Sequence, residues 1–463
     1  MNRRIFGIET EYGITTAGKA GHPSPIDAEE SAHILFQPLV KMGRSTNVYW
    51  RNGGRIYLDV GAHPEFATAE CDTIEDILLQ VRAGQELFAD MCVLGNEHLE
   101  KEGIPGTIHM FSNNEDAEGN SFGCHENYLL RRSRRFREVA DALVSFFVTR
   151  QIVTGSGHIH REGEPRMGYS PRAAHMDDAV SSATTRSRPI INTRDEPLAD
   201  AGEYRRLHVI VGDTNVSESS TAVKVVMTHL ILSAVENGVR IADLALKEPM
   251  EAIREIDDHI GANPKIELED GRWMTPVEIQ RELKQRALAV VDQTDADELT
   301  TRMLDLWDRA LDAVESGDYS SIDTELDWAI KKRLIDRFVE RSGARLDDPR
   351  VARLYLAYHD ITGNSLQKRL EDAAQMVRLT DPNKVELAKS VPPKTTRAHV
   401  RGNLIAAAED YRRDLAVDWL HLRLDDHRAP NVILSDPFTT SDPGADKIME
   451  LIREQDTGAG MFA

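Results

Sequence analysis

A stretch near the N-terminus alternates polar and apolar residues with the period of two that a half-buried β-strand requires. It runs Arg55, Ile56, Tyr57, Leu58 and Asp59. Residues 61–64 interrupt the pattern, and we expect a second short strand to return over residues 65–69. This hairpin predicts a sheet with one apolar face in a core and one polar face that carries Asp59.

The predicted first strand, residues 5–14, repeats this arrangement. Its apolar side chains share one face, whereas Glu9 and Glu11 share the other, about 7 Å apart. Carboxylates gathered in this way repel one another unless they are solvated, protonated or bound to a cation. A hard ion such as Mg²⁺ or Mn²⁺ prefers oxygen ligands and keeps positions open for phosphate oxygens. Alternation alone does not distinguish such a metal-nucleotide site from the solvated face of an edge strand.

Composition excludes several classes of function. The 463-residue chain has a net charge of −21, which argues against a nucleic-acid partner because neutralising phosphates requires clustered Lys and Arg. Its three cysteines lack Cys-x-x-Cys spacing, as is typical of buried thiols in a reducing cytoplasm. The sequence has neither an export signal nor an apolar run of about 18 residues. We therefore expect a cytoplasmic protein with no membrane partner.

Strands and helices are expected in two blocks. Strands are predicted near residues 107–111, 123–129 and 206–211, and helical periodicity dominates from Ser217 onward, which indicates an α+β fold. Paired prolines near residue 391 stop a helix and stiffen a linker. Residues 1–390 are thus expected to form a large domain and residues 391–463 a small C-terminal domain. Within the latter, residues 414–425 alternate as one strand that includes Trp419.

Further polar residues are candidates for lining a cavity or binding phosphate. His125 and His208 lie on predicted strands, although a single histidine in a strand is more often structural. Arginine suits a planar grip on phosphate, and it balances the charge that develops during phosphoryl transfer. Surface arginines are the alternative. Three arginines fall within nine residues: Arg186, Arg188 and Arg194.

Long blocks of the sequence resemble the Pup ligases of the Pup ligase/deamidase family, a group of carboxylate-amine ligases related to glutamine synthetase. They include Gly-Ile-Glu-Thr-Glu-Tyr-Gly at 7–13 and Ser-Ser-Ala-Thr-Thr-Arg-Ser-Arg-Pro at 181–189. The other blocks are residues 55–65, 67–71, 123–128, 190–197 and 205–213. The resemblance implies a glutamine synthetase-like catalytic domain, with a curved, mainly antiparallel sheet backed by helices. It also implies that the small C-terminal domain contributes to the nucleotide site.

The resemblance further implies an ATP-dependent ligase that uses Mg²⁺ and acts on Pup and on lysine-bearing proteins. The γ-carboxylate of the C-terminal glutamate of Pup would take the γ-phosphate of ATP. A substrate lysine would then displace phosphate and form an isopeptide bond, which marks the protein for proteasomal degradation. Phosphorylation is needed because a carboxylate at neutral pH is a poor electrophile.

Family roles carry over to matching positions in this sequence. Glu9, Tyr57 and Glu65 match Mg²⁺ ligands, and Arg55, Thr68 and Trp419 match ATP contacts. Asp59 matches the base that takes a proton from the attacking lysine, although a carboxylate that merely orients the metal ligands is an alternative. For Trp419, the alternative to an ATP contact is a packed position in a hydrophobic core. Phosphate contact or cavity lining is expected for Glu11, His125, Arg186, Arg188, Arg194 and His208.

Three other functions compete with ligation. Pup deamidases and depupylases of the same family carry a long insertion between the first strand and the central hairpin, whereas only about 40 residues separate them here. A catalytically inactive Pup-binding scaffold would not need Glu9, Tyr57, Asp59 and Glu65 together. A ligase for small molecules shares the chemistry, and only the resemblance disfavours it.

Overall fold

The structure is a computed structural model of the whole chain. It describes residues 3–19, 22–41, 45–59, 61–116, 118–134, 136–160, 163–183, 188–292 and 296–454. Within these ranges, no helix combines the length and the apolar character that a bilayer crossing demands.

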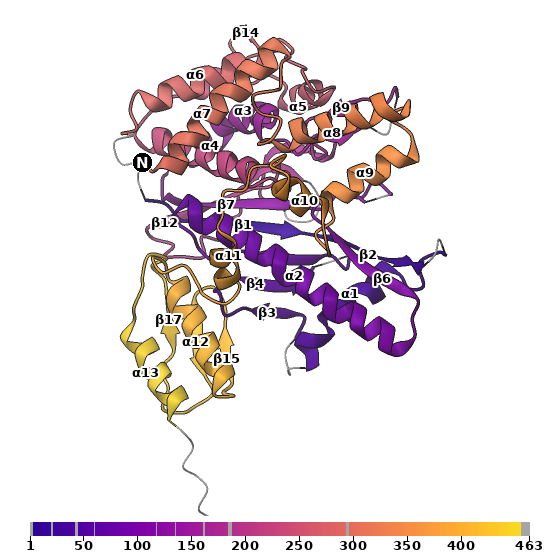
Figure 1. The fold of residues 1–463 in the computed structure, drawn as a ribbon. Helices are drawn as coiled ribbons and strands as arrows, with labels where there is room; N and C mark the ends of the chain where they lie inside the picture. The colour runs from indigo at the N-terminus through magenta and orange to yellow at the C-terminus, as the bar shows by residue number, and fades with distance from the viewer. Residues whose placement is uncertain are drawn as a thin grey trace, which may run out of the picture.

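An eight-stranded sheet forms the centre of the molecule (Figure 1). All its neighbouring strands pair antiparallel except the first two, which are parallel. The mainly antiparallel sheet backed by helices confirms the predicted α+β class. In sheet order the strands are β10 (Asp178–Ser181), β11 (Pro189–Asn192), β12 (Tyr204–Val209), β7 (Cys124–Arg131), β1 (Phe6–Glu11), β5 (Pro64–Ala67), β4 (Arg55–Leu58) and β3 (Asn47–Tyr49).

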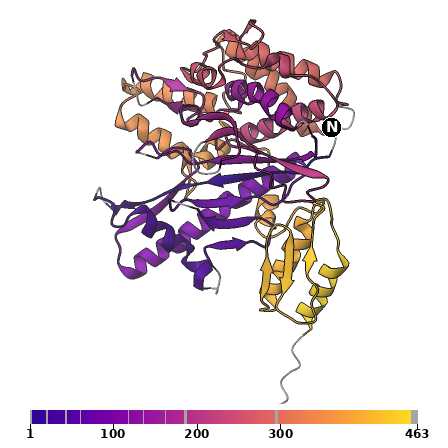
Figure 2. The ribbon, with the colours of Figure 1, turned by 180° about the vertical axis from the view of Figure 1, so that it is seen from behind.

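Helices cover one face of this sheet. The long helix α2 (Ile74–Glu102) crosses the strands in Figure 1, whereas the opposite view in Figure 2 has the strands in front of it. It begins at Thr73, whose side chain accepts from the Asp76 backbone N–H, and ends at Gly103, which adopts the left-handed conformation that glycine tolerates. Most of its apolar side chains are buried, although Leu94 is 46% exposed. Helix α1 (Ala28–Lys41) packs beside it.

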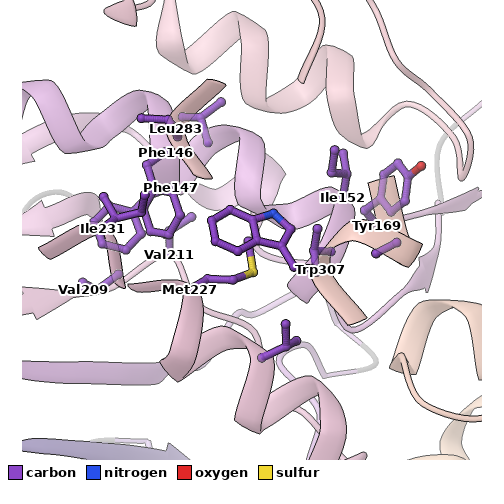
Figure 3. Packing of buried hydrophobic residues seen from close by; sticks show 14 of the residues in the cluster. Phe146, Phe147, Ile152, Tyr169, Val209, Val211, Met227, Ile231, Leu283 and Trp307 are labelled. Carbon is purple, nitrogen blue, oxygen red and sulfur yellow. The ribbon is translucent and has the colours of Figure 1, made fainter. Parts of the chain in front are cut away.

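A helical layer forms the largest hydrophobic core. Figure 3 shows part of this cluster, including Trp307 and Met227, both fully buried. The helices of the layer are α3 (Phe136–Thr154), α4 (Glu218–Glu236), α5 (Pro249–Asp257), α6 (Pro276–Leu288) and α7 (Glu298–Ser316). Those that follow are α8 (Asp327–Ser342), α9 (Pro349–His359), α10 (Leu366–Asp372) and α11 (Pro382–Ala388). The short hairpin strands are β8 (His158–Ile159), β9 (Met167–Gly168), β13 (Ile266–Glu267) and β14 (Trp273–Met274).

Two predicted single strands are in fact pairs. Residues 5–14 were expected to form one strand, but they span β1 and the start of β2 (Gly13–Gly18), which leaves the main sheet to pair with β6 (Gly106–Phe111). Residues 414–425 were also expected to be one strand. They form β15 (Leu415–Val417) and β16 (His421–Leu424), because the Asp418 carboxylate accepts from the backbone N–H groups of Leu420 and His421 and closes a turn.

The C-terminal residues pack around a hydrophobic cluster of their own. This cluster includes Leu404, Leu422 and Ile448, which are buried among α12 (Ala398–Asp410), the strands β15, β16 and β17 (Val432–Ile433), and α13 (Pro443–Arg453). Figure 1 shows this unit in yellow beside the β3 end of the sheet.

Helix α2 approaches β5 closely because it has a glycine at the contact. A Cβ added at Gly84 would lie 2.1 Å from Cδ1 of Phe66, whose ring is buried between the sheet and the helix. A Cβ at Gly95 in the same helix would lie 2.9 Å from Ile108 Cδ1, the flexible end of a side chain.

We expect Gly84→Ala to lower the free energy of unfolding by about 1–3 kcal/mol, because overpacking against a ring outweighs the gain in helix propensity. Gly95→Ala receives the same propensity gain against a yielding neighbour and is the matched control. Urea denaturation of both variants measures the difference, and equal stabilities would contradict the proposed close contact.

Candidate functional site

The uncovered face of the sheet gathers polar side chains from five adjacent strands. We call this the polar face, and the strand register defines it: Glu9 lies opposite His125, and Glu11 lies opposite Glu65. Glu65 in turn lies opposite Tyr57. Its members are Tyr57, Glu65, Glu9, Glu11, His125, Asn127, Arg206 and His208.

Glu9 lies at the centre of this face among hydrogen-bond donors. Asn127 Nδ2 donates to Glu9 Oε1 at 2.9 Å, and His125 Nδ1 lies 3.4 Å from Oε2. His208 Nε2 is 3.9 Å away, as is the Arg206 guanidinium. Burial opposes the ionisation of Glu9, but the His125 hydrogen bond and the neighbouring positive charges hold its pKa well below the usual value. Glu9 is therefore a permanent carboxylate.

Glu65 has the opposite electrostatic environment. Burial raises its pKa to about 9, and the negative charges of Glu9, Glu11 and Asp59 act in the same direction. Tyr57 is hydrogen-bonded to Glu65, and burial together with the charges of Glu9 and Glu65 raises its pKa. Two neighbouring glutamates are thus held in contrasting states, which is a common property of functional sites.

The donor set fits a hard divalent cation. Glu11, Asp59 and Glu65 offer carboxylate oxygens that lie within 4.8 Å of one another. Oxygen donors of this kind suit Mg²⁺, whose charge would relieve the repulsion that raises the Glu65 pKa. A second group, Glu9 with His125 and His208, meets the same distance limit but mixes nitrogen with oxygen. The roles expected for Glu9, Tyr57 and Glu65 stay predictions.

Asp59 lies at the edge of the polar face. It follows β4 directly, is exposed, and donates its backbone N–H to His63 O at 2.9 Å. Its carboxylate reaches Glu11 and Glu65 and faces a pocket described below. This carboxylate is therefore open to solvent, and its role as a base stays a prediction.

A first pocket lies between the sheet and the C-terminal unit. Thr68 and Trp419, two of the predicted ATP contacts, both line it, together with Glu9. Thr68 is buried, and its Oγ1 accepts from the Ile8 backbone N–H at 3.1 Å. Trp419 is half-buried, and its ring meets the edge of Tyr49 at 5.1 Å between centroids. A core position would leave Trp419 without this open side.

Arg55, the third predicted ATP contact, does not line the first pocket. Its Nε donates to Asn47 Oδ1 at 2.8 Å, and its guanidinium lies over the Tyr57 ring at 4.1 Å. The structure thus places Arg55 beside a predicted metal ligand.

A second pocket of about 1510 Å³ opens on the same face. Arg188 and Arg194 are exposed at its wall, where Arg188 donates to Ser121 O at 3.2 Å. Arg186 lies outside the described residues. Arg206 lines both pockets, so they meet beside Glu9. Residues from the prediction that line the second pocket are Glu11, Asp59, His125, Arg188, Arg194 and His208.

Sequence reasoning missed the residues that hold these pockets in place. Arg206 NH1 donates to Asn127 Oδ1 at 3.0 Å; its alternation with His208 was the available signal. Glu70 accepts from Arg397 Nε at 2.7 Å and also pairs with Arg401. This buried contact attaches the C-terminal unit to the sheet. No local sequence pattern predicts it, because more than 300 residues separate its partners.

Comparison with known proteins identifies the family. A family model described as Pup-ligase protein matches residues 4–423. The chain belongs to the Pup ligase family. The Pup–protein ligase of Xylanimonas cellulosilytica is 49% identical, over 97% of this chain and 100% of the relative. That of Saccharomonospora viridis is 48% identical, over 97% and 99%.

Two solved Pup ligase structures share the fold. A crystal structure of the complex between the prokaryotic ubiquitin-like protein Pup and its ligase PafA has a TM-score of 0.91 and 40% identity, over 97% of this chain and 91% of that one. A structure of the Pup ligase PafA in complex with ADP has a TM-score of 0.84 and 41% identity, over 92% and 94%.

In this Pup ligase, Glu65 should make the folding stability depend on pH when no metal is bound. Because its pKa rises from 4.5 to about 9, the native state keeps a proton that the unfolded chain loses, and stability falls as pH rises through this window. Glu65→Gln should therefore raise the free energy of unfolding at pH 8 by about 2 kcal/mol.

The control is Glu70→Gln, the same change at a buried glutamate of opposite character. Burial opposes ionisation there, but Arg401 and Arg397 lower the Glu70 pKa to about 2. The ionised Glu70 therefore stabilises the fold fully above pH 4.5. The Glu70→Gln variant should lose about 3 kcal/mol of unfolding free energy at pH 8. Denaturation at pH 5 and pH 8 in chelator tests both signs; a destabilised Glu65→Gln would refute the Glu65 environment.

Proposed function

We propose that this protein is an ATP-dependent ligase that joins the C-terminal glutamate of Pup to lysine side chains of other proteins. The observation that carries the proposal is a pair of neighbouring pockets that share Arg206, whose guanidinium lies 3.9 Å from Glu9. One pocket suits a nucleotide and the other a carboxylate-bearing chain end. Membership of the Pup ligase family and the likeness to structures with Pup and with ADP support the same function.

The first pocket would hold ATP with its base beside Trp419 and its phosphates toward Glu9. Thr68 offers a wall already ordered by its hydrogen bond to Ile8, and Arg206 offers a positive charge where the γ-phosphate would reach the second pocket. Glu9, Tyr57 and Glu65 would hold Mg²⁺. The ion supplies charge neutralisation for the transferring phosphoryl group.

The second pocket would hold the end of Pup. Pup is activated when its γ-carboxylate oxygen attacks the γ-phosphorus and ADP leaves. The net charge of −21 would repel anionic partners in general, but Arg172, Arg188 and Arg194 place positive charges in this pocket, where a carboxylate could bind. Arg172 is buried and fixed by donation to Phe122 O and Ile210 O, both at 3.0 Å, so it contributes a fixed charge.

Asp59 would complete the second step. A lysine ammonium has no lone pair, so it must lose a proton before its nitrogen attacks the activated carbonyl and displaces phosphate. The exposed Asp59 carboxylate would accept that proton at the mouth of the second pocket. We place this reaction in the cytoplasm, consistent with the three buried free thiols. We also retain the division into residues 1–390 and 391–463.

Ligation is favoured over deamidation. Between β2, which ends at Gly18, and β4, which starts at Arg55, the described chain contains α1 and β3. The relatives named above are ligases.

Asp59→Asn should reduce conjugation at least about 100-fold while nucleotide affinity changes by less than about threefold, because the amide cannot accept the lysine proton. A gel-shift assay with Pup and a lysine-bearing protein measures the first quantity, and nucleotide titration the second. Asp446→Asn, on the distant helix α13, controls for loss of an exposed carboxylate. Loss of nucleotide binding would instead assign Asp59 to the metal site.

Trp419→Ala should raise the KM for ATP about tenfold or more with a smaller change in kcat, because a stacking surface for the base is lost. Trp419→Phe keeps an aromatic face and should lie between the two. Trp273→Ala removes a 56% exposed tryptophan from β14 and is the control. An unchanged KM in Trp419→Ala would remove the base from this pocket.

A further inference from the structure

A second set of metal-ligating side chains lies on other elements than the polar face. His158 and His160 come from β8 and the residue after it, and Asp257 is the last residue of α5. His158 Nε2 lies 2.9 Å from Asp257 Oδ2, and His160 Nε2 lies 3.7 Å from the same oxygen. Ligands of a tetrahedral zinc ion lie about 3.3 Å apart. The observed separations are on either side of that value.

Gly168 packs directly against these groups. A Cβ built on Gly168 would lie 2.6 Å from His158 Nε2, 2.6 Å from His160 Nε2 and 2.6 Å from the carbonyl oxygen of Asp257. Any side chain other than glycine would therefore displace the two imidazole nitrogens. With glycine at this position, the ligand atoms of His158, His160 and Asp257 all lie within 4.8 Å of one another, close enough to bind one cation.

Neighbouring groups orient these side chains. The Ser170 backbone N–H donates to Asp257 Oδ1 at 2.7 Å, which leaves Oδ2 turned toward the histidines. His158 and Asp257 are buried, and His160 is half-buried.

We propose that His158, His160 and Asp257 bind one zinc-class divalent ion between their side chains. Two imidazoles and one carboxylate favour a borderline transition ion over Mg²⁺, which prefers oxygen ligands alone. The ion is structural, because it links the β8–β9 hairpin to the end of α5. The fourth position is left to water.

The site is connected to the polar face through hydrogen bonds. Ser170, whose N–H orients Asp257, also donates through Oγ to Asp213 Oδ1 at 2.8 Å. The Ser156 N–H donates to Asp213 Oδ2 at the same distance. Asp213 follows β12, which carries His208 and Arg206. Metal binding therefore stabilises the segment at the end of a strand that lines both pockets.

Without an ion the same residues satisfy one another. His160 Nε2 lies 2.8 Å from Asp257 O, and His158 bonds the Asp257 carboxylate. A hydrogen-bonded cluster with no metal is the competing interpretation. The two interpretations differ in zinc binding. Only a metal site takes up Zn²⁺ and loses it in Gly168→Ala, whose added carbon would displace the ligand atoms while every ligand residue remains.

The test uses the full chain, stripped with chelator and dialysed against Zn²⁺ in excess Mg²⁺, so that the all-oxygen site is occupied. Wild-type protein should retain about one zinc per chain at this site, measured by elemental analysis. His160→Gln and Gly168→Ala should each bind it at least about 100-fold more weakly. Zn²⁺ should raise the melting temperature of the wild type but not of the variants.

His259→Gln is the matched control, since His259 lies 2.9 Å from Asp258 beside the cluster but is 57% exposed. It should retain zinc as the wild type does. The Glu9, His125 and His208 group is unchanged in all four proteins, so zinc bound there cancels. Co²⁺ added to wild-type protein provides a test free of folding effects, because nitrogen-ligated tetrahedral cobalt absorbs visible light strongly. Equal zinc retention in wild type, His160→Gln and Gly168→Ala, or the absence of that band, would overturn the proposal.

Discussion

Repulsion among carboxylates dominates the electrostatics of the site. One face of the sheet brings these carboxylates together, and they are partly buried there. Burying the apolar face against α2 and the helical layer forces every second residue of β1, β4 and β5 to the opposite side. Glu9, Glu11 and Glu65 therefore all lie on that opposite face. Asn127, His125 and Arg206 balance Glu9, whereas Glu65 is left protonated beside Tyr57. A polar face in this state is poised for a divalent cation.

The second requirement is the buried ion cluster of Glu70, Arg397 and Arg401. Charged groups this deep are destabilising unless they are paired, and here each has partners: Arg397 also donates to Leu434 O and Leu198 O, and Arg401 to Gly53 O. The cluster holds Trp419 opposite Thr68, since the Arg401 guanidinium lies 4.9 Å from the Trp419 ring. The first pocket thus exists because a C-terminal unit with its own core is attached at this point.

Local periodicity accounts for what could be predicted from the sequence. The β4–β5 hairpin and the shared face of Glu9 and Glu11 both follow from residue spacing. The predicted strand over residues 414–425 was wrong because the carboxylate of one residue, Asp418, accepts hydrogen bonds from two backbone N–H groups and turns the chain where alternation continues. Residue spacing does not predict a side-chain contact that competes with strand pairing.

The sequence by itself determined which side chains share a face and, through its resemblance to Pup ligases, which chemistry to expect. The tertiary structure alone decided that Thr68 and Trp419 meet in one pocket, that Arg55 lies outside it, and that Arg206 borders both pockets. It also placed Gly168 against two histidines and the end of α5. The physical reason is that the backbone period within a strand sets which face each side chain occupies. Pockets instead form between elements that can lie hundreds of residues apart in the sequence.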